Sequence, residues 1–408
     1  MEQAVIVAAV RSPLAKAGKG AFADLRIDDV CAEVLRGALQ RVPRLNPKLI
    51  EDVLIGCAMP EGEQGLNVAR NVSFLAGLPL SCGAATINRF CSSSLEAINQ
   101  AARAIMCGDG ECFIAGGVES MSHVPMGGFN PSLNEKLMKD GMPAAYIGMG
   151  ETAEKLANKY KISREEQDKY SLASHQKAVA AIKSGKFKDE IVPIRISHPD
   201  PERSRGERIS GIQLGDSSVG ALPQNNIIVM QDEGPREDTA LEKLAALKPA
   251  FLKDGTVTAG NSSQMTDGAA ITIVMSKSLA KKLKIKPLAR IISMAVAGCD
   301  PSTMGEGPIF AVPKALKRAG MKLKEIDLVE LNEAFASQTI AVVRGLRIDT
   351  AKLNIHGGAI ALGHPLGATG ARCMATLINA LRQYKKSIGL ETMCVGGGQG
   401  VATIIERI

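Results

Sequence analysis

The chain has no tryptophan, and aromatic residues make up only 3% of its 408 positions. Surfaces that bind nucleic acid by stacking bases need such side chains, so the composition argues against this function class. Apolar runs are short and interrupted by glycine or charge, and none is long enough to span a bilayer. A strand-like run begins at residue 5, which leaves no room for a signal peptide, and the ending Glu406-Arg407-Ile408 is no peroxisomal signal. We therefore expect a cytoplasmic protein without a transmembrane segment.

The cysteines form neither a metal-binding nor a disulfide pattern. There are nine, an odd number, and no two are spaced as Cys-x-x-Cys. In a chain with no export signal this count favours reduced thiols. The five histidines form no ligand-spaced cluster with them, so we expect no metal site and no tightly bound cofactor. The formal net charge of +7 is modest; it can help to bind a polyanionic small molecule, but ordinary solvation is the simpler explanation.

Strand-like apolar runs alternate with segments of helical period, which indicates an α/β fold with a large core. A repeat runs through this pattern. Ala-Leu-Gln-Arg at 38–41 and Ile-Glu-Asp-Val-Leu-Ile at 50–55 return as Ala-Leu-Lys-Arg at 315–318 and Ile-Asp-Leu-Val-Glu-Leu at 326–331. Cys112 and the glycines after it return similarly at Cys394. Because helix, strand and turn recur in order, the sequence predicts two related α/β halves.

The region between the halves, residues 121–250, lacks the repeat and is rich in lysine, glutamate, glycine and methionine. Ser163 and Glu166 have the spacing of a capping box, which predicts the start of a helix. The polar, glycine-rich stretch 197–226 predicts a surface excursion. We interpret the region as an insertion domain over the active site, although a purely structural elaboration explains it equally well. The expected division is 1–120, completed by 251–276, as the N-terminal half, 121–250 as the insertion, and 277–408 as the C-terminal half.

One cysteine falls where a strand meets a helix. An apolar strand ends near Asn88, and the residues from Leu95 onward follow helical spacing, so Cys91 lies at the turn between them. At a helix N-terminus the dipole and the free backbone N–H groups favour a thiolate, which is the form that attacks carbonyl groups. A buried structural cysteine fits this context equally well.

Three further segments carry polar groups suited to chemistry. His356 and His364 lie in one glycine-rich loop before an amphipathic helix, which favours a functional role for at least one of them. Asn332 and Glu333 follow a strand, at the end of α/β sheets where ligands usually bind. Cys394 precedes a run of glycines; a strand follows these rather than a helix, so they are no dinucleotide-binding motif and can form a simple tight turn.

Together, these segments resemble the thiolase family, and the resemblance extends over essentially the whole chain. Its motifs occur in the family's order: Asn-x-x-Cys ending at Cys91, Gly-Gly-x-Glu-Ser-Met-Ser at 116–122, Thr-Ala-Gly-Asn-Ser-Ser at 258–263, Asn-Glu-Ala-Phe at 332–335, Gly-His-Pro at 363–365 and Cys-x-Gly-Gly-Gly at 394–398. The sequence of these motifs is most similar to that of the degradative 3-ketoacyl-CoA thiolases of fatty-acid β-oxidation. The resemblance implies a thiolase-like α/β fold, with two duplicated mixed-sheet halves in a layered αβαβα core and an inserted loop domain.

The resemblance also implies a two-cysteine mechanism. Cys91 is the nucleophile that carries the acyl group, and His364 takes its proton. Cys394 protonates the departing acetyl-CoA enolate and then deprotonates the incoming coenzyme A. His364 and a water held by Asn332 form one oxyanion site, and the backbone N–H groups of Cys91 and Gly396 form the other. His356 is not a catalytic position in the family pattern.

Coenzyme A enters this scheme as a substrate. By resemblance, Phe251, Ala259 and Ser263 contact its pantetheine arm, and Met149 lies near the acyl group. The expected assembly is a homodimer or a dimer of dimers, with a β-oxidation multienzyme complex as a further partner and no nucleic acid.

Two departures from the family bear on the substrate. Ser92, Ser93 and Ser94 follow the nucleophile, whereas the family usually has Ala or Gly directly after it and often Gly at the third position, so added hydroxyls can narrow the acyl pocket or tune Cys91. Gly148 stands where some short-chain members have His, which argues against the alternative of a biosynthetic acetoacetyl-CoA thiolase. A β-ketoacyl synthase-like enzyme leaves Cys394 without a role. If the chain were a non-catalytic acyl-CoA-binding protein, we would expect at least one of Cys91, His364 and Cys394 to be missing, and all three are present.

Overall fold

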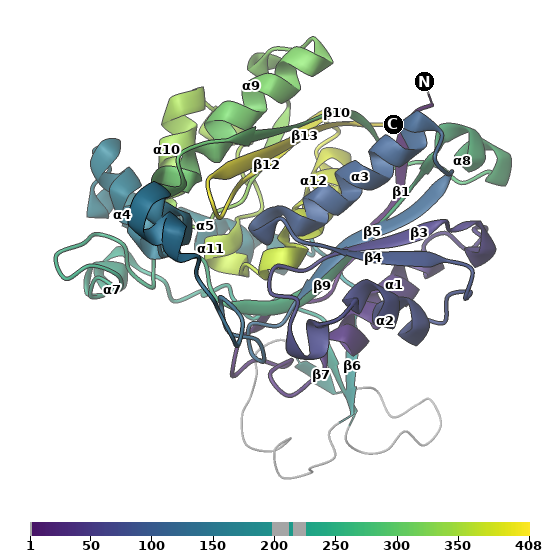
Figure 1. Ribbon diagram of the computed structural model, residues 1–408, viewed down its shortest axis with the longest axis horizontal. Coiled ribbons are helices and arrows are strands. Elements are labelled where there is room, and N and C mark those ends of the chain that lie inside the picture. Colours follow the sequence, from purple (N-terminus) through teal and green to yellow (C-terminus); the bar gives the residue numbers. More distant parts are fainter. Residues whose placement is uncertain (1, 198–211, 215–225) are drawn as a thin grey trace.

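The computed structural model describes residues 2–197, 212–214 and 226–408. Its main sheet has the strand order β11-β12-β13-β10-β1-β9-β5-β3-β4, with β2 paired to β9 (Figure 1). The strands are β1 (Ala4–Arg11), β2 (Ala15–Lys16), β3 (Asp52–Gly56), β4 (Gly83–Ile87), β5 (Cys112–Glu119), β9 (Thr266–Ser276), β10 (Ala289–Gly298), β11 (Leu328–Leu331), β12 (Ile388–Val395) and β13 (Gln399–Arg407). A second sheet contains β6 (Ile194–Ser197), β8 (Asn226–Val229) and β7 (Ile212–Leu214), in that order.

Helices cover both faces of the main sheet. They are α1 (Ile27–Gln40), α2 (Val68–Leu75), α3 (Ser93–Cys107), α4 (Met149–Lys159), α5 (Arg164–Lys183), α7 (Leu241–Ala245), α8 (Lys277–Leu283), α9 (Gly307–Ala319), α10 (Ala336–Leu346), α11 (Ala359–Leu362) and α12 (Thr369–Gln383). The short turns used below are η1 (Pro47–Leu49), η3 (Phe90–Ser92), η7 (Leu323–Glu325) and η9 (Leu366–Ala368).

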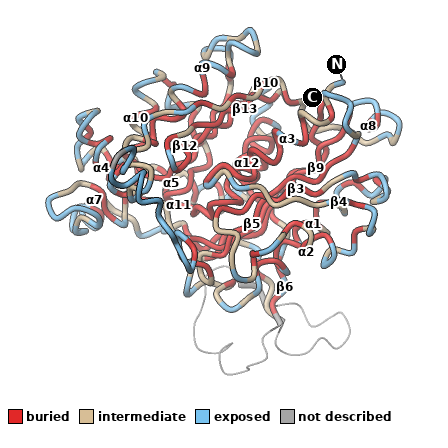
Figure 2. Tube along the Cα trace, viewed as in Figure 1, coloured by how far each residue is buried: buried red, intermediate tan, exposed pale blue. Residues whose placement is uncertain are grey.

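The sheet consists of two halves that meet over a short contact. Strands β1 and β10 pair only at Val5 with Arg290 and at Ile6 with Ala289. Helices α3 and α12 lie between the two halves, while α1 and α2 cover one outer face and α9 covers the other (Figure 1). Both central helices are buried along most of their length (Figure 2). The layered αβαβα arrangement expected from the sequence is therefore confirmed.

The sequence repeat corresponds to a structural repeat. Helix α1, turn η1 and strand β3 recur as α9, η7 and β11, and the central helices α3 and α12 each lead into a strand, β5 and β12. The strands β3 and β5 are parallel neighbours, and so are β11 and β12. Equivalent motifs therefore lie at equivalent sheet positions, which brings the β4–α3 turn and the end of β12 toward the same central layer.

The region between the halves packs beside the C-terminal half. Helix α4 contacts α10, and α5 contacts both α10 and α11 (Figure 1). The helix start predicted at Ser163 is confirmed, because Ser163 and Glu166 form a reciprocal capping box at the beginning of α5. Most of the stretch 197–226, predicted as a surface excursion, lies outside the described residues. Strand β9 follows residue 250 in the chain and lies between β1 and β5 in the sheet. The domain boundaries themselves stay a prediction.

Candidate active site

Cys91 lies in a tight turn, η3, between β4 and α3. The residue before it, Phe90, has φ of 43°, a left-handed conformation that costs energy for a bulky side chain. Side chains hold this strained turn: Asn88 Oδ1 accepts the Phe90 N–H at 2.8 Å, and Ser93 Oγ accepts the Arg89 N–H at 2.9 Å. Ser93 Oγ also donates to the Phe90 carbonyl at 2.7 Å. The polar residues around the nucleophile therefore fix its backbone.

The serines that follow Cys91 have largely structural contacts. Ser93 stabilises the turn, and Ser94 Oγ accepts the Ala371 N–H at 2.9 Å, which links α3 to α12. Ser92 Oγ is buried and has no hydrogen-bond partner in the described part of the chain. Of the three hydroxyls, only that of Ser92 therefore has no structural contact among the described residues.

Burial, rather than the helix terminus, controls the acidity of the nucleophile. Cys91 is buried, which raises the pKa of its thiol to about 11, while the backbone N–H groups of Gly396 and Cys91 itself lower it by less. The expectation of a stabilised thiolate is therefore wrong for the unliganded site. The two N–H groups do lie at the sulfur, where an oxyanion formed on attack also has to be stabilised.

Alkylation of Cys91 is accordingly expected to rise with pH over a wide range. Iodoacetamide reacts with the thiolate, whose fraction increases about tenfold per pH unit below the thiol pKa. Because that pKa is about 11, the rate measured on the Cys91 peptide by mass spectrometry is expected to rise steadily from pH 7 to pH 10. A plateau below pH 8 would show instead a preformed thiolate–imidazolium pair.

The hydrogen bonds of His364 define its tautomer. Its Nδ1 lies 2.6 Å from Thr369 Oγ1, and this hydroxyl donates its only proton to the Pro365 carbonyl at 2.8 Å. Thr369 must therefore accept from His364, so Nδ1 carries the proton and Nε2 is unprotonated. Burial and, to a lesser extent, the nearby Arg372 together lower the pKa of His364 to about 3, so the ring is neutral at physiological pH. A neutral imidazole with a bare Nε2 can act as a base.

Asn332 contacts the reactive nitrogen of this histidine. Its Nδ2 lies 3.3 Å from His364 Nε2, while its Oδ1 is buried and has no partner in the described part of the chain. Unpartnered buried carbonyl oxygens usually bind water. The free oxygen therefore fits the expected water that completes an oxyanion site with His364.

Replacing Thr369 with valine is expected to lower kcat about 10- to 100-fold with little change in KM. Valine has a similar shape but offers no acceptor to Nδ1, so the imidazole loses the contact that selects its tautomer and orientation. Steady-state thiolysis kinetics measure the effect. Thr369→Ser keeps the hydroxyl and is expected to restore most of kcat. An equal loss in both variants would show that the site requires the methyl group rather than the hydrogen bond.

Cys394 occupies the end of β12, in an apolar environment close to Cys91. It is fully buried, in a cluster with Phe335, Val257 and Met149. Burial raises the pKa of this thiol well above its ordinary value, and the neighbouring Cys91 raises it further. The two thiols thus interact electrostatically although they belong to different halves of the sheet. A neutral thiol in this place is a proton donor.

Two buried carboxylates position the site, and their motifs did not reveal this role. Glu119 Oε2 accepts the N–H groups of Ala58 at 2.8 Å and of Gly367 at 2.7 Å, and so connects the end of β3 to the loop that carries His364. Glu333, predicted at a ligand-binding edge, is instead saturated by the protein. It accepts hydrogen bonds from Tyr170 at 2.8 Å and Ser174 at 2.7 Å, which link it to α5. For Glu119, the signal available in the sequence was an acidic residue within the glycine-containing motif at 116–122.

The residues expected to contact coenzyme A lie in two places. Phe251 is 45% exposed and packs edge-on against Phe335, with ring centroids 5.9 Å apart, and Phe335 shares the cluster of Met149 and Cys394. Ala259 is exposed and lines a separate cavity of about 200 Å³. The Ser263 N–H donates to the Ala334 carbonyl at 2.9 Å, which joins the 258–263 segment to the Asn-Glu-Ala-Phe motif.

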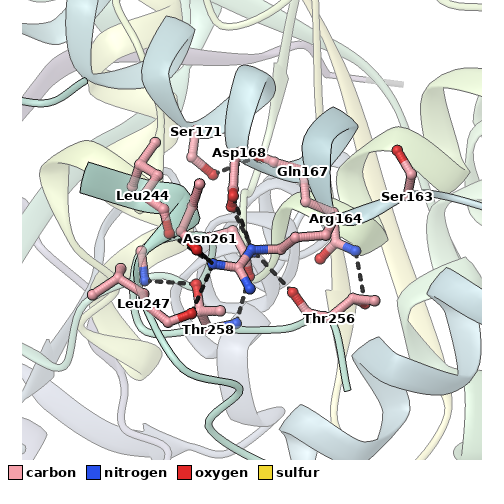
Figure 3. Close-up of polar contacts among 12 residues, drawn as sticks. Ser163, Arg164, Gln167, Asp168, Ser171, Leu244, Leu247, Thr256, Thr258 and Asn261 are labelled. Carbon is pink, nitrogen blue, oxygen red and sulfur yellow. Dashed lines mark hydrogen bonds and ion pairs between the residues drawn. The ribbon is translucent and has the colours of Figure 1, made fainter. Parts of the chain in front are cut away.

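A polar network holds the loop that carries Ala259 and Ser263 (Figure 3). Asn261 Nδ2 donates to Asp168 Oδ1 at 3.1 Å, and its Oδ1 accepts the Thr258 N–H at 2.8 Å. Arg164 forms an ion pair with Asp168 at 2.8 Å and donates to the Leu244 carbonyl at 2.7 Å. Helix α5 therefore fixes both the 256–261 loop and α7.

His356 lies apart from this chemistry. It is buried beside Phe187 and Tyr384, with ring centroids 5.8 and 5.7 Å away, and burial lowers its pKa to about 4. Among the described residues, no group of His, Cys, Asp and Glu side chains is arranged to hold a metal ion. In the same part of the chain, no helix is long and apolar enough to cross a membrane.

Comparisons with known proteins identify the family. The thiolase N-terminal domain model matches residues 4–278, and the thiolase C-terminal domain model matches residues 285–407. The chain belongs to the thiolase family. Curated thiolase relatives include the 3-ketoacyl-CoA thiolases of Bacillus subtilis and Shewanella baltica, each 47% identical over the full length of both chains.

Solved thiolase structures share the fold. The acetyl-CoA acetyltransferase of Bacillus anthracis has a TM-score of 0.86 at 40% identity, and human mitochondrial 3-ketoacyl-CoA thiolase has a TM-score of 0.86 at 38% identity. In both cases the match covers 100% of this chain and 99% of the other. The family and the thiolase fold expected from the motifs are confirmed.

Proposed function

We propose that this thiolase cleaves 3-ketoacyl-CoA with coenzyme A into acetyl-CoA and a shortened acyl-CoA, as in fatty-acid β-oxidation. The observation that carries the proposal is the approach of two buried thiols from the two halves of the fold: Cys91 lies in η3 and Cys394 in β12, and these two elements contact each other. The full-length similarity to proteins named 3-ketoacyl-CoA thiolase supports this direction.

The first half-reaction transfers the acyl group to Cys91. As the sulfur attacks the 3-keto carbon, its proton passes to Nε2 of His364, the unprotonated nitrogen. A preformed thiolate is not needed, because the thiol can lose its proton during the attack. Breaking the C2–C3 bond then leaves an acyl thioester on Cys91 and an acetyl-CoA enolate. The neutral Cys394 thiol protonates C2 of this enolate.

The second half-reaction returns the acyl group to coenzyme A. The Cys394 thiolate takes the proton of the incoming thiol, whose sulfur attacks the acyl-enzyme. Cys91 leaves as a thiolate and recovers its proton from His364. Burial disfavours the charge on each of these groups, so each charged form is short-lived and the proton returns.

Two oxyanion sites fit the two oxygens that gain charge. The N–H groups of Gly396 and Cys91 lie at the nucleophilic sulfur, where the 3-keto oxygen becomes an alkoxide. His364 and a water on the free oxygen of Asn332 serve the enolate oxygen. The two backbone N–H groups are donors already in place, and Nε2 of His364 becomes a donor once it has taken the proton of Cys91.

Coenzyme A is the second substrate, and we place it beside the 251–263 stretch. Phe251 offers an exposed ring at the edge of the Cys394 cluster, with Ser263 next to it through Ala334. Met149, in the same cluster, lies near the acyl group, and the exposed Ala259 of the same stretch contacts the pantetheine arm. This places the thioester next to both cysteines.

The biosynthetic formation of acetoacetyl-CoA is the second candidate. The similarity to a structure named acetyl-CoA acetyltransferase favours it, whereas Gly148 argues for a wider range of substrates.

We further propose that the protein is a homodimer or a dimer of dimers, because β4 ends the main sheet with one edge free for pairing within the described chain. A cytoplasmic location is proposed as well. The three-part domain division and a β-oxidation multienzyme partner belong to the same proposal.

A thiolysis assay over a chain-length series tests the function. Loss of 3-ketoacyl-CoA on addition of coenzyme A is expected for substrates longer than acetoacetyl-CoA, with a higher kcat/KM than for acetoacetyl-CoA itself. Activity confined to acetoacetyl-CoA would favour the second candidate. Absence of thiolysis with every substrate would refute both.

A further inference from the structure

A second cavity lies at the opposite end of α12 from the catalytic residues. Its volume is about 410 Å³, and its lining includes Arg382, in the last turn of α12. His364 lies just before the first turn of the same helix. Arg382 is thirteen positions after Thr369, which corresponds to about 20 Å along the helix axis. The cavity is therefore separate from the thiolase site.

The cavity results from a gap beside β1. On one side of this strand, β10 pairs only with Val5 and Ile6, and the next pairing on that side joins Arg11 to Ile191. Residues 7–10, between these contacts, have no strand neighbour on that side within the described chain, and all four line the cavity. The fold thus leaves a hollow of the size range typical of small-molecule sites.

Positive charge surrounds this hollow. Five cationic side chains stand against a single carboxylate among its described lining residues, a surplus of four positive charges: Arg41, Arg44, Lys284, Lys286 and Arg382, against Asp189. Arg41, Lys284 and Arg382 lie at the C-terminal ends of α1, α8 and α12, and the other two cations lie in the segments that follow α1 and α8. Like charges that converge on a concave surface attract anions strongly.

Most of these cations remain available to a ligand. Arg382 pairs with Asp189, and Arg44 donates to the Lys284 carbonyl at 2.8 Å. In the described part of the chain, the side chains of Arg41, Lys284 and Lys286 form neither a hydrogen bond nor an ion pair. Cations are common at helix C-termini because they offset the dipole. That explanation does not cover Lys286, which lies three residues beyond the end of α8.

The lining also indicates what the anion is attached to. Ile285, Leu288 and Ile378 provide apolar surface. The side-chain nitrogen of Asn379 donates hydrogen bonds to Glu190 and to the Ala375 carbonyl, so its side-chain oxygen remains able to accept one. Arginine forks match phosphate oxygens better than they match a single carboxylate. We propose that this cavity binds a small diphosphate-bearing, nucleotide-like metabolite at a site distinct from the thiolase active site.

Isothermal titration of the full-length protein with inorganic pyrophosphate, ADP and succinate tests this site. Pyrophosphate and ADP are expected to bind, ADP more tightly because it also covers the apolar surface, and succinate at least tenfold more weakly than pyrophosphate. The double variant Arg41→Ser/Lys286→Ser is expected to weaken pyrophosphate and ADP about tenfold or more. The matched control, Lys281→Ser/Lys282→Ser, removes two cations of α8 outside the lining and is expected to stay within about twofold of the parent.

Thiolysis and the melting temperature are measured on the same variants, and both are expected to be unchanged. The site is thereby tested independently of the proposed function. Absence of binding by pyrophosphate and ADP, an equal loss in the control, or ADP binding that survives the double variant would overturn the proposal. Succinate binding as tightly as pyrophosphate, or ADP binding no more tightly than pyrophosphate, would overturn the assigned ligand class.

Discussion

Thiolysis is expected to fall by about 10³-fold or more when Cys91 is replaced with serine, while the protein stays folded. A serine hydroxyl has a far higher pKa than a thiol and is a much weaker nucleophile in a buried site. The volume change is small, and the turn around residue 91 is held by Asn88 and Ser93 rather than by the sulfur. Initial rates of 3-ketoacyl-CoA cleavage measure the loss, and circular dichroism checks the fold.

The control is Cys31→Ser, at a fully buried cysteine in α1 of the outer layer. It is expected to keep near-normal thiolysis, which separates the loss of a nucleophile from the burial of a hydroxyl. Labelled acyl group trapped during turnover is expected on the Cys91 peptide. Recovery of the label on any other cysteine would disprove the assignment of the nucleophile.

Replacing Cys394 with alanine is expected to abolish thiolysis but to preserve alkylation of Cys91 by iodoacetamide. The enolate then lacks its proton donor and coenzyme A lacks its base, whereas the nucleophile keeps His364. Iodoacetamide labelling and the thiolysis assay, performed on the same preparation, measure the two properties.

His364→Ala provides the contrast, since it is expected to lose most of both thiolysis and alkylation. Cys373→Ala serves as the control for a buried thiol on α12 that lies outside the proposed chemistry. If Cys394→Ala retained near-normal thiolysis, the two-cysteine mechanism would fail. A synthase-like role, in which the second cysteine does nothing, would then explain the protein better.

The fold could be predicted because the same local patterns occur twice. The segments around Ile50 and Ile326 each place a helix, a one-turn linker and a strand in succession, and short-range periodicity is enough to recognise them. The joining of the halves could not be predicted in the same way. It depends on two residue pairs between β1 and β10, which are separated by most of the chain and have no distinctive residues.

The candidate site was predictable as a set of motifs but not as an electrostatic environment. The position of Cys91 at a helix start suggested a thiolate, yet the pKa of the thiol is raised, because burial against Leu366 and Ala58 outweighs the backbone N–H groups. The role of Thr369 was equally hidden. It follows from one proton on one hydroxyl, and sequence spacing contains no information about where that proton points.

The burial of α12 has a consequence for how the chain unfolds. Thirteen of its fifteen residues are buried, and it contacts strands from both halves of the sheet, including β1, β9, β11 and β12. Neither half can therefore shield its apolar face from water while the other is unstructured. The two repeats, although they read as separate modules, form one cooperative unit. A chain divided between them yields fragments that need each other to fold, and the site on which both cysteines converge exists only in the joined state.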